Sequence, residues 1–131
     1  MGGGARYADD KIIQHNGKGT VVIDGFYAQD FGKVYRSCGN CGNKPRKVQM
    51  SNVLAVRPKS GILAVNQNFG DQATLRNIHI RATSSKAVPV CMWSQGVSSG
   101  EPKITDDGPL PPLCNYSPSD IHQTTIKLRR D

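Results

Sequence analysis

Three short segments of the sequence share one pattern and recur at nearly regular intervals, at residues 21–28, 48–55 and 73–80. In each segment, apolar residues alternate with other residues on both sides of a glycine or an asparagine. These central residues, Gly25, Asn52 and Asn77, are 27 and 25 residues apart. Glycine and asparagine tolerate the left-handed backbone that a sharp bend between two strands can need. The pattern therefore predicts one bent pair of short strands that is repeated along the chain.

Repeats of about 20–50 residues are typical of solenoids, in which each coil buries its apolar side chains by stacking on its neighbours. Further short apolar runs lie between the segments, at residues 33–35, 62–65 and 88–91, and no segment has a convincing helical periodicity. We predict an all-β fold, a right-handed parallel β-helix. The alternative is an antiparallel sandwich, but it explains neither the recurrent Gly or Asn position nor the lack of two-residue hairpin turns between paired strands.

The chain has 131 residues, which is enough for one domain. Its composition changes near residue 96 to serine, glycine, aspartate and proline, and five of its eight prolines lie in residues 102–118. We therefore expect a β-helical domain at residues 2–121, made of coils over about residues 2–95 and a proline-rich closing loop over about residues 96–121. The role of the tail at residues 122–131 is unknown.

The charge of the chain favours an acidic partner. Lysine and arginine number 17 against 10 aspartates and glutamates, which gives a formal charge of +7. Nucleic acid, an anionic membrane surface and a polyanionic carbohydrate all fit this sign. The 37% hydrophobic and 21% charged residues are globular values, and no apolar run is long enough to span a membrane. No signal-peptide pattern is present at residues 1–7.

The four cysteines are Cys38, Cys41, Cys91 and Cys114. An even number indicates two disulfides in an exported protein, and reduced thiols or a metal site in a cytosolic one. A zinc ribbon needs two close pairs, and only Cys38 and Cys41 are close in the sequence, so disulfides are favoured. Three connectivities are possible. Pairing Cys38 with Cys41 and Cys91 with Cys114 is favoured by proximity alone.

Two lysines are predicted to lie side by side on neighbouring coils. The segments that begin at Lys11 and Lys33 are 22 residues apart, and both read lysine, apolar, any residue, polar before a turn. Neighbouring strands are about 4.8 Å apart, so the two ammonium groups repel each other unless an anion lies across them. A polyuronate, with one carboxylate per sugar, is such an anion. The alternative is that both lysines extend into water, as surface lysines usually do.

Five motifs follow one another along roughly residues 2–121. Residues 2–17 read GGGARYADDKIIQHNG and residues 30–41 read DFGKVYRSCGNC. Residues 66–74 read NQNFGDQAT, residues 101–104 read EPKI and residues 114–121 read CNYSPSDI. In this order they resemble the second half of the pectate lyases of polysaccharide lyase family three. Several separate motifs are much harder to obtain by chance than one.

The resemblance implies a parallel β-helix, a secreted enzyme, bound calcium and cleavage of de-esterified pectin (polygalacturonate or pectate) by β-elimination. It implies catalytic roles for Lys11, Lys33 and Arg36, and substrate binding by Lys11 and Lys33. Removal of the C5 proton of a galacturonate requires that its carboxylate be neutralised, which calcium and lysines achieve. By resemblance Arg36 is the base. Lys33 competes for this role, because a guanidinium holds its proton strongly and a lysine beside other cations loses it more readily.

The spacing of the basic residues sets a geometric condition on one shared cleft. On a continuous strand, Lys33 and Arg36 would point to opposite faces, because they are three residues apart. We therefore expect the strand to end near Tyr35, where residues 37–40 are typical of a turn.

The calcium-binding carboxylates of the family are expected upstream of the segment that begins here at Gly2. The chain is thus predicted to hold about the second half of the enzyme, without its N-terminal coils and with no metal ligands of its own. Asp9, Asp10 and Asp30 precede the basic motifs, but alternation separates Asp9 from Asp10, and calcium takes about six to eight oxygen ligands. We expect these aspartates to be turn or supporting residues, and the full-length enzyme to be a monomer.

Three functions are compared. The first is an extracellular, calcium-dependent pectate lyase, represented by a partial chain. The second is a non-catalytic polyuronate-binding or effector-like module that keeps the lysine pair. The third is a basic nucleic-acid-binding domain, which is the weakest because no helix, aromatic stacking pair or RNA-binding motif accompanies the charge. Polygalacturonate is therefore the expected partner, and neither nucleic acid nor a membrane is expected.

Overall fold

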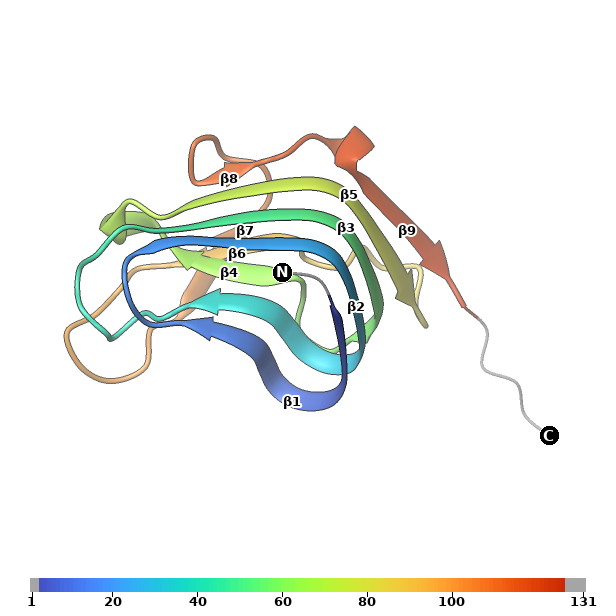
Figure 1. Ribbon diagram of the computed structural model, residues 1–131, viewed down its shortest axis with the longest axis horizontal. Helices are drawn as coiled ribbons and strands as arrows, with labels where there is room; N and C mark the ends of the chain where they lie inside the picture. The colour runs from blue at the N-terminus through green and yellow to red at the C-terminus, as the bar shows by residue number, and fades with distance from the viewer. Residues whose placement is uncertain (1–2, 127–131) are drawn as a thin grey trace.

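The alternating segments form long, bent strands that stack in parallel on one another in the computed structural model, which describes residues 3–126 (Figure 1). The strands are β1 (Gly3–His15), β2 (Gly19–Ser37), β3 (Arg46–Pro58), β4 (Leu63–Asn66), β5 (Gln72–Ala82), β6 (Cys91–Ser94), β7 (Ile104–Asp107), β8 (Cys114–Asn115) and β9 (Ile121–Thr125). Within residues 3–126 the only helices are two short 3-10 turns, η1 (Gln67–Phe69) and η2 (Pro118–Asp120), and neither could cross a membrane. The predicted parallel β-helix is confirmed.

The repeated Gly or Asn position is the bend of each coil. Gly25, Asn52 and Asn77 have φ angles of 71°, 55° and 55°, in the left-handed region that the sequence pattern predicts. Their flanking residues are in register across β2, β3 and β5. Asn77 Nδ2 donates to Asn52 Oδ1 at 2.8 Å, and Asn52 Nδ2 donates to Asp24 Oδ1 at 2.9 Å. The amide side chains therefore join neighbouring coils at the bend.

We expect Asn52→Ala to lower the free energy of unfolding by about 1–3 kcal/mol, since alanine is strained at positive φ and loses the amide hydrogen bonds. Asn52→Gly loses the same hydrogen bonds without the backbone strain, so its loss should be smaller. Urea unfolding of the two variants measures the difference. Equal losses would show that the left-handed backbone is not what selects asparagine here.

The core lies inside the coils and is built from inward-facing residues at equivalent positions. Alternation along each strand places one apolar side chain from each coil above its equivalent in the next coil. Three such columns are fully or almost fully buried: Ile23, Met50 and Leu75; Phe26, Val53 and Ile78; and Ala28, Ala55 and Ile80. The stacked core makes the outer faces of the coils a rigid base for a site.

The closing segment is more ordered than the sequence pattern suggests. Residues 96–121, predicted as loop, contain β7, which pairs antiparallel with β6, and also β8 and η2. Only Cys91 of the apolar run at residues 88–91 belongs to β6. Strand β9 continues past residue 121 beside β5. Part of the predicted tail, residues 127–131, lies outside the described residues.

Two disulfides join Cys38 to Cys41 and Cys91 to Cys114, the pairing that proximity favours. Both sulfurs of the second bridge belong to fully buried residues. This bridge connects β6 to β8, so it fastens the closing segment to the coils.

Candidate functional site

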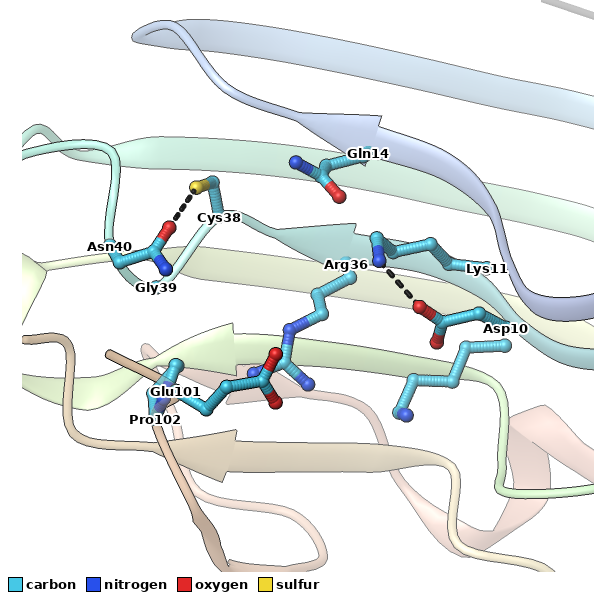
Figure 2. Close-up of a pocket in the computed structure, with 10 residues that line it drawn as sticks. Asp10, Lys11, Gln14, Arg36, Cys38, Gly39, Asn40, Glu101 and Pro102 are labelled. Atoms are coloured by element: carbon cyan, nitrogen blue, oxygen red, sulfur yellow. Dashed lines mark hydrogen bonds and ion pairs between the residues drawn. The ribbon is translucent and has the colours of Figure 1, made fainter. Parts of the chain in front are cut away.

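The outer face of the solenoid is hollowed where the ends of β1 and β2 meet two loops. This hollow, which we call the basic cleft, has a volume of about 350 Å³. The strands contribute Asp10, Lys11, Gln14, Lys33 and Arg36. The loops contribute residues 38–40 and 101–102 (Figure 2). The three residues to which the resemblance gives catalytic roles therefore line one cleft.

The lysine pair follows the stacking of the coils. Lys11 is in register with Lys33, and Gln14 is in register with Arg36. The predicted placement of the two lysines side by side is thus confirmed. Lys33 does not extend freely into water, since its residue is only 9% exposed. Lys11 Nζ forms an ion pair with Asp10 Oδ2 at 2.6 Å, where Figure 2 draws a dashed line.

A β-bulge brings Lys33 and Arg36 to the same cleft. The backbone N–H groups of Val34 and Tyr35 both donate to Ile62 O, at 2.8 and 3.3 Å, and both side chains are fully buried. Two residues of β2 therefore oppose one residue of the next coil, and the alternation shifts by one position. The expectation that the strand ends near Tyr35 is wrong, because β2 continues to Ser37.

Positive charge is crowded in the basic cleft. Burial lowers the pKa of Lys33 from its ordinary value, and the nearby Arg36 and Lys11 lower it further, while Asp10 opposes the shift. The hydrogen bond from Lys11 holds the pKa of Asp10 below its ordinary value, and the other cations of the cleft add to this effect. A bound anion would relieve the repulsion between the cations, so the cleft suits an anionic ligand.

The lowered pKa of Lys33 predicts that stability rises with pH. Between this pKa and the ordinary value of 10.5, the unfolded chain binds more protons than the folded chain. The free energy of unfolding should therefore increase as pH rises through that interval. Urea unfolding at a series of pH values measures the slope, which Lys33→Met should reduce and Lys103→Met, at an exposed position, should leave in place. An unchanged slope in Lys33→Met would contradict the assignment.

Buried hydrogen bonds hold the backbone on both sides of Arg36. The hydroxyl of Tyr35 lies 2.7 Å from His15 Nδ1 and 2.8 Å from Ser37 Oγ. Burial raises the pKa of Tyr35 to about 12, so the phenol stays protonated at neutral and moderately alkaline pH. Burial also lowers the pKa of His15, which favours its neutral form. These contacts fix the end of β1 against β2 beneath the cleft.

Three polar lining residues were not assigned a role from the sequence: Gln14, Asn40 and Glu101. Gln14 is separated from Arg36 by the same coil spacing as the two lysines, so its position next to Arg36 could have been predicted from the sequence. Asn40 and Glu101 reach the cleft only because two loops dock on each other, and no local pattern indicates that.

The aspartates near the basic motifs have separate roles. Asp10 supports Lys11 in the cleft. Asp30 pairs through both carboxylate oxygens with Arg57, at 2.6 and 2.7 Å, and lines a different hollow. The side chain of Asp9 is outside the described part of the chain. Among the described residues, no three His, Cys, Asp or Glu side chains gather as a metal site.

Comparison with known proteins identifies similar chains. The family model described as pectate lyase matches residues 1–101. A probable pectate lyase F from Aspergillus terreus is 54% identical over 101 residues, which cover 76% of this chain and 41% of the relative. A probable pectate lyase E from Aspergillus clavatus is 43% identical over 120 residues, which cover 89% of this chain and 44% of the relative. The chain thus spans less than half the length of these curated relatives.

Solved structures agree with the sequence comparison. Pectate lyase PelI from Erwinia chrysanthemi, in complex with tetragalacturonic acid, superposes with a TM-score of 0.80 at 30% identity. The match covers 95% of this chain and 43% of PelI. Pectate lyase Pel3 from Pectobacterium carotovorum gives a TM-score of 0.81 at 27% identity, over 94% of this chain and 42% of Pel3.

Proposed function

Because this chain belongs to the pectate lyase family, we propose that its basic cleft binds polygalacturonate and supplies the basic residues for β-elimination. The observation that carries the proposal is the convergence of Lys11, Lys33 and Arg36 on one cleft. Their positive charges suit a chain with one carboxylate per sugar. The tetragalacturonic acid bound to the structurally similar PelI supports the same ligand class.

Each basic side chain has a role in this proposal. Lys11 and Lys33 bind the uronate carboxylate and stabilise the negative charge that develops on it when C5 loses its proton. Arg36, which must be in its unprotonated form to act as a base, takes that proton, and Lys33, with its lowered pKa, is the alternative base. The electron pair of the C5–H bond forms the C4–C5 double bond, the C4–O4 bond breaks, and O4 leaves with a proton from water.

Calcium dependence is part of the proposal, and only the membership of the family supports it. The cleft carboxylates do not fit a calcium site by themselves, because Asp10 is paired with Lys11 and calcium takes about six to eight oxygen ligands. The steps assigned above therefore use only the side chains of this chain.

We also propose an extracellular location in contact with the plant cell wall, and a monomeric full-length enzyme. The two disulfides support the location, since such bridges persist in oxidising compartments.

The test combines turnover and binding. The chain is mixed with polygalacturonate, first with calcium and then with a chelator, and the ultraviolet absorbance of the unsaturated product is followed. Titration calorimetry with trigalacturonate measures binding in parallel. Product formation supports the lyase. Binding without product supports the second candidate, a polyuronate-binding module that uses the in-register Lys11 and Lys33. Salt-sensitive binding to DNA alone would overturn both.

A further inference from the structure

One side of the basic cleft is a wall formed by two loops, residues 38–40 and 100–102, which we call the cleft wall. Gly39 O accepts a hydrogen bond from Val97 N at 2.7 Å, and Asn40 Nδ2 donates to Gly100 O at 2.8 Å. Gly39 packs so closely on Pro102 that a Cβ atom there would lie 2.3 Å from Pro102 Cγ. The disulfide between Cys38 and Cys41 closes the first loop. The two loops therefore hold each other in place.

The cleft wall carries one carboxylate, that of Glu101. Figure 2 shows this side chain reaching from the wall toward the guanidinium of Arg36, with Lys11 on the other side of Arg36. Glu101 is exposed and lines the basic cleft. Within residues 3–126 it forms no ion pair. Its carboxylate therefore faces the cleft with its acceptor sites open to a ligand.

Among the other charged groups of the cleft, the cations are donors and the carboxylate of Asp10 is already engaged. Protonated lysine and arginine side chains can donate hydrogen bonds but cannot accept them. The carboxylate of Asp10 accepts from Lys11. A sugar also has hydroxyl groups that donate, and these need an acceptor when they leave water. Glu101 is the charged acceptor that remains.

We propose that Glu101 accepts a hydrogen bond from a ring hydroxyl of the uronate whose carboxylate lies on the lysines, and so determines how the sugar is oriented. This inference rests on the proposed function. A sugar turned the other way would place its carboxylate against Glu101, and two carboxylates repel each other. The lysines select the charge of the ligand, and Glu101 selects the side on which its hydroxyl groups lie.

Two substitutions separate hydrogen bonding from charge. Glu101→Gln keeps an oxygen acceptor and removes the charge, whereas Glu101→Ala removes both. In calorimetric titration with trigalacturonate, we expect Glu101→Ala to weaken binding about tenfold, which equals about 1.4 kcal/mol. Glu101→Gln should stay within about threefold of the unaltered chain. Lys103→Ala, an exposed control in the same segment that does not line the cleft, should bind like the unaltered chain.

Other outcomes overturn the proposal. Tighter binding by both Glu101 variants would show that the carboxylate only repels the ligand. Equal weakening in both would show that its charge is required, and no change would show that it does not contact the sugar. Failure of the proposed function looks different. If the unaltered chain binds no trigalacturonate, the proposed function itself fails. If Lys33→Ala loses binding while the Glu101 variants bind like the unaltered chain, only this inference is overturned.

The position of the wall provides a second test. Gly39→Ala must displace Pro102 and the adjacent Glu101, so it should weaken trigalacturonate binding about as much as Glu101→Ala does. Gly17→Ala is the matched control, because a Cβ at Gly17 meets no atom within 4 Å. Unchanged affinity in Gly39→Ala would show that the wall does not position a ligand contact.

Discussion

Replacing Arg36 with alanine is expected to lower the rate of release of unsaturated product from polygalacturonate by about 10²–10⁴-fold, the usual contribution of a general base. Arg36 lines the cleft beside the lysine pair, and the bulge at Val34 and Tyr35 brings it to that face. Its removal takes away the proposed proton acceptor and leaves both lysines in place. Ultraviolet absorbance with saturating polygalacturonate measures the rate.

The control for this substitution is Gln14→Ala, which alters an uncharged cleft residue in register with Arg36. It should change the rate by less than about tenfold, because it removes a neutral contact rather than the base. A rate in Arg36→Ala similar to that in Gln14→Ala would contradict the role of Arg36. If Lys33→Ala alone abolished turnover while still binding trigalacturonate, Lys33 would be the base.

The coils could be predicted because their signal is local. Alternating apolar residues determine which side chains point inward, and a Gly or Asn at each bend tolerates the positive φ angle found at Gly25, Asn52 and Asn77. The register of Lys11 with Lys33 follows from the coil spacing alone. In a solenoid, equivalent positions on successive coils lie one strand spacing apart, so distance along the chain translates directly into distance in space.

The side of β2 on which Arg36 lies could not be predicted in the same way. It depends on a bulge at which two N–H groups of β2 share the carbonyl oxygen of Ile62, a residue of the next coil. No residue type in β2 indicates this bulge, because valine and tyrosine suit a regular strand equally well. Glu101 was missed for a similar reason, since the contact between Asn40 and Gly100 joins residues 60 positions apart.

The sequence also does not predict that Arg46 is important for stability. A single arginine at the start of an alternating strand is usually a solvated side chain, yet Arg46, the first residue of β3, is fully buried. Its guanidinium donates to the backbone oxygens of Asn16, Gly42 and Lys44, and its own N–H donates to Asp71 Oδ1 at 3.0 Å. It therefore fixes the turn between β1 and β2 against the loop before β3.

We expect Arg46→Ala to lower the free energy of unfolding by about 3–5 kcal/mol. The substitution leaves the carbonyl groups of Asn16, Gly42 and Lys44 without their buried donor and opens a cavity. It also removes the cation that helps to offset the burial that raises the pKa of Asp71. Lys47→Ala, at the exposed next position, is the control and should change stability by less than about 0.5 kcal/mol. Urea unfolding followed by circular dichroism compares the two, and equal stability would mean that the buried guanidinium does not hold the turn.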